Sequence, residues 1–462
     1  MKTLNVVLPL LTAVLLTGCD GAKDCDGGAL WVIESDEVID RCAADFDIKY
    51  ALYAVDSVFY VGYYDVNHHL KVAKKDFSGS WTYKTFDEKV NWDSHRYISL
   101  AIDKEETIHL ACNMHKDPLV YYRSTRSGDI ASMERYAMTD VFEDSVTYPE
   151  FLQADTTLIF HYRNGRSGDG STYFNVYHPE TRTWDKLQDE PLFDGAGESN
   201  SYFKGPVLGG DGNFHLIWCW RDEPDCETNH GLYYAFSEDL KEWRTADGFT
   251  KTAPITPDDD AFLVDDIRVK EGLINGGFAL GFDERQSPII GYHKYDENDH
   301  TNLYTAVFEE GDWTLRRMTD WDWKWDFSGR GSIPFELTVD AVGQYDSVQY
   351  LYGSRMTDEG PFKKKAMKSF RARFKEGEGT AVESAEYDYP RSLDRPWRRG
   401  MLVHKEFDAG DGGQDDTVRY LLRYETLYPS RDKQQKKRPG TVSSLHLVKI
   451  RRTSPSFLHK KV

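Results

Sequence analysis

The sequence predicts an all-β chain, a seven-bladed β-propeller with four-stranded antiparallel blades. Aromatic residues make up 14% of the 462 residues, and tyrosine, tryptophan, valine and threonine are abundant, which favours strands. Periodic stretches of alanine, leucine, glutamate and lysine, which indicate helices, are scarce. A strand–turn–strand pattern recurs seven times at a spacing of roughly 60 residues, which suits one blade of four short strands.

In the recurring unit, a tight polar turn joins a first strand to a second strand that is rich in aromatic residues. Most units continue with another short strand, and tryptophan often marks the end of the unit. The unit is too long for one coil of a β-helix, and the number of units favours a propeller over a sandwich. The seven second strands are SVFYVGYYD (57–65), TIHLACNMH (107–115), TTLIFHYRN (156–164), NFHLIWCWR (213–221), SPIIGYHKY (287–295), SVQYLYGSR (347–355) and TVRYLLRYE (417–425).

The chain begins with MKTLNVVLPLLTAVLLTGCD, which has the lysine and the apolar run of a secretory signal. Its last four residues match a bacterial lipobox, in which Cys19 is lipidated; an ordinary signal peptide with an incidental cysteine is the alternative. We expect residues 1–18 to be a lipoprotein signal peptide, 19–45 an N-terminal tether and first segment, and 46–462 the propeller domain. The protein is then exported and lipid-anchored to a bacterial membrane, on its periplasmic or cell-surface side.

Cysteine and charge content narrow the class of protein further. In an oxidising compartment Cys25 and Cys42 could pair. Five cysteines remain besides Cys19, and this odd number leaves at least one free or bound to a metal.

The net charge of −20 argues against nucleic acid as a ligand, because its binding relies on lysine and arginine. A polyanionic ligand would need a local basic pocket. Two basic stretches, residues 361–375 and 431–440, are expected to be solvated loops.

Three successive hairpins carry polar side chains at their open ends. Two residues of a hairpin lie opposite each other when they are equally far from the centre of its turn. In a propeller these ends gather at one mouth of the central channel, so the residues are expected to share one site; a merely packed rim is the alternative. The three pairs, each predicted to lie directly opposite, are His95 with His115, Tyr148 with Arg163, and Tyr202 with Arg221.

This set of two histidines, two tyrosines and two arginines contains no carboxylate. Glycoside hydrolysis normally needs two carboxylates that flank the bond, so the set does not favour it. The set suits β-elimination on a uronic acid. There, an arginine neutralises the sugar carboxylate, a histidine near neutral pKa takes the C5 proton, and a tyrosine or second histidine protonates the leaving oxygen.

Several motifs make the sequence similar to a known family. WDSHRYISLAID, IHLACNMH, VTYPEF, YRNGRSGDG and GPVLGGDGNFHLIWCWRDEPDCETNH resemble BNR-4-type propeller proteins, and among these the ulvan lyases of polysaccharide lyase families 24 and 25. The resemblance covers most of residues 50–330. It implies an enzyme that cleaves ulvan, the sulfated rhamnose–uronate polysaccharide of green algae, at the uronate C4–O4 bond and leaves a 4,5-unsaturated uronate.

The resemblance also implies roles for individual residues. His95 corresponds to the general base, Tyr148 to the acid and Arg163 to the residue that neutralises the carboxylate, although base and acid stay open among His95, His115 and Tyr148. The segment between Tyr148 and Arg163 is about one residue shorter than the family pattern, which leaves Arg166 as the alternative to Arg163. The further substrate-binding residues are expected to be Tyr202, Arg221, Arg166 and Asn113.

A metal site is the remaining expectation. Cys226 and His230 are four residues apart in CETNH, and His293 lies on the inner strand of the next unit; thiolate and imidazole suit zinc. The resemblance implies a structural Zn²⁺ near the site, and the alternative is a free cysteine with hydrogen-bonded histidines. His109 and His215, which occupy equivalent positions in their units, are expected to be structural. No organic cofactor is expected.

Two other functions remain open on the sequence alone. One is a carbohydrate-binding or sialidase-like propeller without lyase activity, although the sequence has only one degenerate Asp-box, SEDLKEW. The other is a structural propeller at the cell surface. We expect a monomer whose partner is an anionic algal polysaccharide, with no preference for glucuronate or iduronate predicted.

Overall fold

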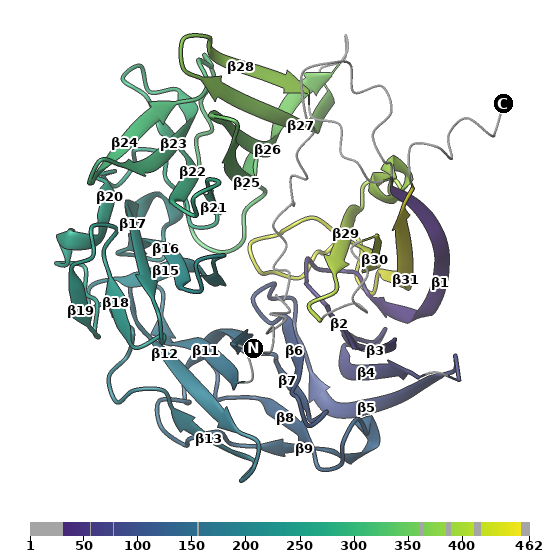
Figure 1. The fold of residues 1–462 in the computed structure, drawn as a ribbon. Helices are drawn as coiled ribbons and strands as arrows, with labels where there is room; N and C mark the ends of the chain where they lie inside the picture. Colours follow the sequence, from purple (N-terminus) through teal and green to yellow (C-terminus); the bar gives the residue numbers. More distant parts are fainter. Residues whose placement is uncertain are drawn as a thin grey trace, which may run out of the picture.

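Seven antiparallel sheets are arranged around a ring in the computed structural model of the protein (Figure 1). The structure describes residues 31–55, 57–76, 78–154, 157–359, 364–384, 390–410 and 417–453. In each sheet most strands that are neighbours in the sequence pair with one another, so the chain runs back and forth from the inside of the ring to the outside. The all-β prediction and the four-stranded antiparallel repeat are confirmed.

The first three sheets follow one another along the chain. The first contains β2 (Ala51–Val55), β3 (Val58–Tyr64), β4 (His69–Lys75) and β5 (Trp81–Lys89). The second contains β6 (Ile98–Ile102), β7 (Ile108–Cys112), β8 (Tyr121–Ser124) and β9 (Met133–Tyr136), with the short 3₁₀ helix η1 (Ile130–Ser132) before β9. The third contains β10 (Val146–Ala154), β11 (Thr157–Arg166), β12 (Asp169–His178) and β13 (Thr183–Lys186), and β14 (Phe193–Asp194) also pairs with β12.

The next three sheets continue around the ring. The fourth contains β15 (Asn200–Leu208), β16 (Phe214–Arg221), β17 (Asn229–Ser237), β18 (Glu242–Arg244), β19 (Thr250–Thr252) and β20 (Leu263–Asp265), with η2 (Cys226–Thr228) and η3 (Asp260–Phe262) in its loops. The fifth contains β21 (Phe278–Phe282), β22 (Pro288–Tyr295), β23 (Thr301–Glu309) and β24 (Asp312–Arg317). The sixth contains β25 (Leu337–Tyr345), β26 (Val348–Glu359), β27 (Lys364–Lys375) and β28 (Gly379–Ser384).

The seventh sheet joins the two ends of the described chain. Its strands are β29 (Leu402–Phe407), β30 (Val418–Thr426), β31 (Val442–Arg452) and, on the outside, β1 (Trp31–Ala43); η4 (Arg391–Asp394) precedes it. β1 pairs antiparallel with β31, from Trp31 opposite Arg452 to Ala43 opposite Val442. About half of the segment that the sequence assigned to the N-terminal tether, residues 31–43 of 19–45, is therefore a strand of this sheet.

All seven predicted second strands are the second strands of their sheets: β3, β7, β11, β16, β22, β26 and β30. Their side chains are mostly buried, and the largest apolar cluster joins residues of the first, second, third and seventh sheets. Aromatic side chains fill the space between sheets, where Trp218, Trp220 and Trp243 are fully buried. The richness in aromatic residues that indicated strands thus supplies the core of the ring.

One of the two basic stretches is not the loop that we expected. Residues 364–375 form β27, whose Phe370 and Ala372 are buried while the cations between them face outward. These cations pair with glutamates of β28 and its turn, as in Arg371 with Glu383 and Lys375 with Glu378. Alternation of apolar and charged residues is the pattern of a half-buried strand, and here it outweighed the high charge.

Some expectations concern segments outside the described ranges. Cys19, Cys25 and the signal peptide at residues 1–18 lie there. Cys42 is buried, and its thiol donates to the carbonyl oxygen of Ser443 at 3.7 Å. Within the described ranges, no helix is long and apolar enough to cross a membrane.

Candidate active site

The six polar residues predicted to converge come from three neighbouring hairpins, β6–β7, β10–β11 and β15–β16. His95 and His115 lie just outside the first hairpin, and the other four lie within or at the open ends of the next two. The structure brings all six together through a chain of contacts. The ring centroids of His95 and Tyr148 are 5.8 Å apart, and those of Tyr148 and Tyr202 are also 5.8 Å apart.

The predicted register of the β6–β7 hairpin is confirmed. Ile98 pairs with Cys112 and Ile102 with Ile108, so the turn is centred on residue 105 as expected. Continuing this register past the paired strands places His95 and His115 side by side. Their rings stack with centroids 4.1 Å apart and an interplanar angle of 24°.

The predicted pairing is wrong in the next two hairpins, because each contains a β-bulge and the turn of β15–β16 is centred on residue 211, half a residue earlier than the predicted pair requires. In β10–β11 the register shifts between Thr147 and Glu150, so Arg163 lies opposite Thr147 rather than Tyr148. In β15–β16 it shifts between Lys204 and Val207, and Arg221 lies opposite Asn200. A bulge adds unpaired residues to one strand, and counting from the turn cannot detect them. The side chains still meet, because long side chains reach diagonal neighbours across a sheet.

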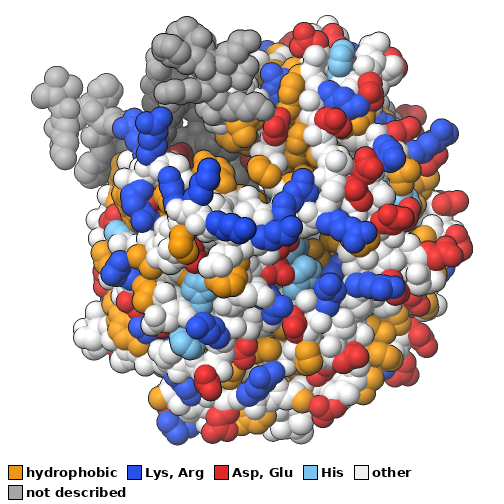
Figure 2. Space-filling model, turned by 180° about the vertical axis from the view of Figure 1, so that it is seen from behind, with side chains coloured by type: hydrophobic (Ala, Val, Ile, Leu, Met, Phe, Trp, Pro, Cys, Tyr) orange, Lys and Arg blue, Asp and Glu red, His pale blue; other side chains and the backbone are white. Residues whose placement is uncertain are grey.

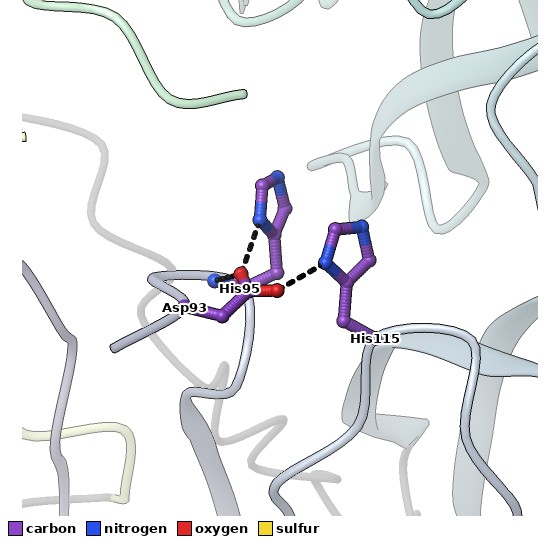
Figure 3. Close-up of side chains that lie close together, drawn as sticks. All are labelled: Asp93, His95 and His115. Atoms are coloured by element: carbon purple, nitrogen blue, oxygen red, sulfur yellow. Dashed lines mark hydrogen bonds and ion pairs between the residues drawn. The ribbon is translucent and has the colours of Figure 1, made fainter. Parts of the chain in front are cut away.

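Asp93 holds the two histidines in place. Its Oδ1 accepts hydrogen bonds from the backbone nitrogen of His95 at 3.0 Å and from Nδ1 of the same ring at 2.8 Å. Its Oδ2 accepts from Nδ1 of His115 at 2.5 Å. Both imidazoles are thereby held as the tautomer protonated at Nδ1, and Figure 3 shows that their remaining ring nitrogens point away from Asp93. The two nitrogens able to exchange protons with a ligand are the two Nε2 atoms.

The shared carboxylate gives the two imidazoles different proton affinities. Burial lowers the pKa of His95, but the hydrogen bond to Asp93 and the charge of Asp432 outweigh burial, so the pKa is raised above its ordinary value. Burial and the positive charges of His95 and Arg163 lower the pKa of His115. Burial would raise the pKa of Asp93, yet its two histidine partners hold it far below its usual range. The shared carboxylate and its surroundings thus favour the imidazolium form of His95 over that of His115.

Tyr148 reaches the site because the bulge in β10 turns its side chain. Its φ is +58°, in the left-handed region that side chains other than glycine rarely adopt. The guanidinium carbon of Arg163 lies 5.0 Å from the centroid of its ring. Burial and the neighbouring Tyr202 raise the pKa of Tyr148 well above its ordinary value, so this phenol keeps its proton near neutral pH.

The two arginines differ in how much of their hydrogen-bonding capacity the protein uses. Nη1 of Arg163 donates to Oη of Tyr202 at 3.4 Å, but its Nε and Nη2 are buried and have no partner among the described residues. Arg221, in contrast, donates from Nε to the carbonyl oxygen of Glu223 at 3.0 Å, from Nη2 to Pro224 and from Nη1 to Tyr202 at 3.4 Å. A buried guanidinium with unpaired donors is costly, which makes Arg163 the arginine suited to an anionic ligand.

Tyr202 lies between these two arginines. Of the two phenols in the site, it is the one whose pKa is shifted toward neutral pH. Its Oη also contacts Oγ of Ser167 at 3.1 Å. Burial would raise the pKa of Tyr202, but the charges of Arg163 and Arg221 outweigh burial and lower it to about 7. A phenol of this kind exists partly as phenolate at neutral pH and can accept a proton.

Two of the expected substrate-binding residues are engaged elsewhere. The side chain of Arg166 is 72% exposed and pairs with Asp169 at 3.3 Å, so it does not replace Arg163 inside the site. Asn113 is buried, donates from Nδ2 to Glu88 at 2.5 Å and accepts from Arg96 at 3.2 Å. These bonds use Asn113 to hold the loop that carries His115.

The residues proposed for zinc do not gather. The structure places Nε2 of His230 2.8 Å from Oδ1 of Asp222, and burial raises the pKa of the Cys226 thiol. His293 is fully buried beside Trp325, and burial lowers its pKa to about 4. Across the described ranges, the one set of three or more ligand atoms within 4.8 Å of one another belongs to Asp93, His95 and His115. The three residues do not fit a zinc ion held by all of them, and we derive no step through zinc.

The structural role expected for His109 and His215 is confirmed. Both are buried, and each has Nδ1 at 2.7 Å from a tyrosine hydroxyl, that of Tyr121 and Tyr234 respectively. In each case Nε2 contacts an aspartate in the hairpin turn. This repeated arrangement fixes the closed end of a hairpin, while the site occupies the open end.

Sequence reasoning assigned no role to the two acidic residues that surround His95. Asp93 is two positions before it, in WDSH, and an aspartate at this spacing commonly accepts from the backbone nitrogen two residues on, which is a signal that could have identified it. Asp432 is 338 positions from Ser94, whose Oγ donates to its Oδ1 at 2.8 Å, and no local pattern indicates this contact. Its Oδ2 lies 3.7 Å from Nδ1 of His95.

Comparison with known proteins adds relatives of both sequence and fold. The long isoform of ulvan lyase from Pseudoalteromonas sp. (strain PLSV) is 26% identical over 156 residues, which are 30% of this chain and 14% of that protein. The corresponding protein of Glaciecola sp. (strain KUL10) is 25% identical over 158 residues, 32% of this chain and 15% of that protein. The match therefore spans a small part of the length of these relatives.

Solved structures resemble nearly the whole chain in fold. The crystal structure of polysaccharide lyase Uly1 has a TM-score of 0.58 and 16% identity, and covers 91% of this chain and 99% of that one. A PL25 ulvan lyase has a TM-score of 0.57 and 12% identity, with 91% and 95% covered. The model of the BNR repeat-containing family matches residues 58–321, more than half of the sequence. This chain therefore belongs to the BNR repeat-containing family.

Proposed function

We propose that the protein is a polysaccharide lyase that cleaves ulvan by β-elimination at the uronate C4–O4 bond. The observation that carries this proposal is the buried guanidinium of Arg163, whose Nε and Nη2 lack partners among the described residues, next to two imidazoles and two phenols. Relatives named ulvan lyase support the choice of polymer, and a PL25 ulvan lyase of similar fold is bound to -[GlcA(1-4)Rha3S]-.

In the proposed reaction, Arg163 neutralises the carboxylate of the uronate. The C5 proton next to a carboxylate is only weakly acidic, because its removal places a second negative charge on the same group. Two parallel N–H donors from one guanidinium match the two carboxylate oxygens and stabilise the developing enediolate. Nε and Nη2 of Arg163 are the donors without a partner among the described residues, and we assign this contact to them.

The remaining groups of the site divide into proton acceptors and proton donors. His115, whose pKa is lowered, and the phenolate of Tyr202 are suited to accept a proton near neutral pH, whereas His95, whose pKa is raised, and the phenol of Tyr148 are suited to donate one. His95 was expected to be the base, and its raised pKa favours the acid role instead. Two acceptors and two donors thus offer more than one combination of base and acid for the reaction.

The bond changes balance with these groups alone. A base takes the C5 proton, the C5–H electron pair forms the C4=C5 double bond, and the C4–O4 bond breaks. An acid then protonates the leaving oxygen, which becomes a hydroxyl group at the new, saturated end of the other fragment.

We further propose that the seven sheets are the blades of a closed seven-bladed propeller and that Cys19 carries a lipid anchor on an exported protein.

Incubation of the purified protein with ulvan tests the proposal. The expected result is an increase in ultraviolet absorbance from conjugated uronate ends, with product masses that correspond to unsaturated oligosaccharides. The His95→Ala variant should give neither signal. Binding of ulvan without any change in its chain length would contradict the proposal and support a carbohydrate-binding propeller instead.

A further inference from the structure

The loop between β30 and β31 concentrates positive charge. Its segment from Arg431 to Arg438, here called the basic loop, reads RDKQQKKR and has five cationic side chains and a single carboxylate. Lys433, Lys436 and Lys437 are exposed. The expectation that residues 431–440 form a solvated loop is correct, but composition alone does not explain where this loop lies.

Asp432 fixes the basic loop against the candidate active site. Its Oδ1 accepts from Oγ of Ser94 at 2.8 Å, and its Oδ2 accepts from the backbone nitrogen of Ser332 at 3.0 Å and lies 3.7 Å from Nδ1 of His95. Figure 1 shows this loop, in yellow, extending from the seventh sheet toward the middle of the ring. Lys433 directly follows the residue that contacts the histidine cluster, so the positive charge begins at the edge of the site.

Topology places the whole loop on the face of the ring that holds the site. The connection between the second and third strands of a sheet lies at the open end of its first hairpin, and His115 occupies the same kind of connection in the second sheet. On the face drawn in Figure 2, lysine and arginine side chains gather across the middle, with histidines beside them.

At the opposite, turn-side ends of two of the sheets, acidic side chains outnumber the single arginine, Arg285. A cavity of about 580 Å³ there is lined by the hairpin turns of the fifth and sixth sheets, including Asp283, Glu284, Glu309 and Glu310. Positive charge near the site is therefore a local feature in a chain with 77 acidic and 57 basic residues.

The three lysines of the basic loop are neighbours, and none of them has an acidic partner in the described part of the chain. Within the described ranges, Lys433, Lys436 and Lys437 form no ion pair. On β27, by contrast, Lys375 pairs with Glu378 at 2.6 Å and Arg371 with Glu383 at 2.6 Å. In a chain with an excess of carboxylates, three neighbouring lysines without partners repel one another, and an external anion would relieve that repulsion.

We propose that the basic loop is a binding site for the sulfate groups of the polysaccharide, next to the uronate held by Arg163. This inference rests on the proposed function for the identity of the polymer. Lysine suits the purpose because its ammonium is a compact charge on a flexible stem, which tolerates variable spacing between sulfate groups. The loop supplies the local basic pocket that an acidic protein needs in order to hold a polyanion.

Binding measurements at several salt concentrations test this proposal. The triple variant K433Q/K436Q/K437Q is compared with the unchanged loop, both in a His95→Ala background that prevents cleavage, using ulvan and chemically desulfated ulvan as probes. Because the triple variant removes three exposed charge contacts, we expect its affinity for ulvan at low salt to be about tenfold lower. Because neutralised anions release counterions, the dependence of log affinity on log salt should also become shallower. Lys375→Gln, which removes an exposed but paired lysine, should change neither quantity.

The outcomes separate this inference from the proposed function. The loop assignment is overturned if the triple variant and the unchanged loop bind ulvan with equal affinity and equal salt dependence, even if the protein cleaves ulvan. An equal loss for desulfated and native ulvan also overturns it, because carboxylates would then be the ligands. If the triple variant binds anionic phospholipid vesicles more weakly than the unchanged loop does, but binds ulvan equally well, the loop contacts a membrane surface instead. Lysine-dependent binding without any cleavage supports the loop assignment and contradicts the lyase proposal.

Discussion

At the residue scale, Asp93 is the group whose removal should be most informative. In Asp93→Asn the neutral amide can no longer favour the imidazolium of His95, so the pKa of His95 falls toward or below its ordinary value. We expect kcat/KM on ulvan to fall at least about 100-fold, the typical contribution of an acid–base group. The alkaline limb of the pH profile should move to lower pH, because His95 loses its proton earlier.

A matched control for this variant exists in the same sheet. Asp103 contacts Nε2 of His109 at 3.3 Å at the closed end of the hairpin, away from the site. Asp103→Asn is expected to lower the thermal midpoint while leaving the shape of the pH profile unchanged. An unchanged profile in Asp93→Asn as well would mean that neither histidine exchanges a proton during catalysis.

The two candidate carboxylate-binding arginines can be separated by substitution. Arg163→Ala removes the buried donors that stabilise the developing enediolate, and we expect kcat to fall by about 10²–10³. Arg166→Ala removes an exposed side chain paired with Asp169 and should change kcat less than twofold, within the range of surface pairs. Steady-state kinetics on ulvan measures both, and the reverse order of effects would assign the role to Arg166.

Tyr202 offers a spectroscopic prediction that does not depend on activity. With its pKa lowered to about 7, one phenol should ionise near neutral pH in an ultraviolet difference titration. Tyr202→Phe should abolish that step. Arg221→Gln removes a positive charge that stabilises the phenolate, so the step should move to higher pH. Persistence of the step in Tyr202→Phe would assign it to another tyrosine.

At the element scale, close packing between neighbouring inner strands depends on glycine. A Cβ atom on Gly281 of β21 would lie 1.8 Å from the carbonyl oxygen of Val342 on β25, so one strand would have to move. Gly281→Ala should cost about 1–3 kcal/mol of unfolding free energy, as overpacked sites do. In Gly343→Ala on β25, the new methyl group would meet nothing closer than 3.5 Å, and this control should be nearly neutral in chemical denaturation.

Hairpins also determine how far the site could be predicted from the sequence. The stacked pair of His95 and His115 follows from counting residues about one turn, because β6 and β7 have no bulge. The other two pairings failed because the Tyr148–Pro149 and Gly205–Pro206 steps interrupt their ladders, and because the turn of β15–β16 is centred on residue 211 rather than just after it. Asp432 could not be predicted at all, since its contact with Ser94 depends on how a loop of the seventh sheet reaches the segment before the second sheet, with the first sheet between them in the ring. Local periodicity reports strands and turns, whereas contacts across the ring need the complete fold.

At the scale of the whole molecule, β1 should contribute measurably to stability. Ile39, Cys42 and Ala43 are buried, and without β1 the outer edge of β31 would be unpaired. A chain that begins at residue 44 should lose about 3 kcal/mol or more relative to one that begins at residue 31, from the burial of these side chains alone. It should also associate more readily, because an exposed strand edge pairs with other chains. Calorimetry and light scattering on the two truncated chains measure these effects, and equal midpoints would contradict them.

The general fold could be predicted because every sheet repeats the same composition. Aromatic second strands and polar turns occur in each unit, and these identify the sheets without any information about their neighbours. The exception was β27, where a run of cations concealed a strand. The participation of β1 in the last sheet was not visible either, because the residues of β1 are mostly exposed and resemble a linker.

The pairing of β1 with β31 has a consequence for how the protein is made. Arg451 contacts Glu34, 417 positions earlier in the chain, so the first described strand finds its partner only when almost the entire polypeptide has been synthesised. Until then β1 has no partner, and the polypeptide carries unpaired edges that chaperones must protect. Any nascent chain that stops before residue 442 lacks the strand that joins its beginning to its end, so premature termination should yield material destined for proteolysis rather than a shortened but working protein.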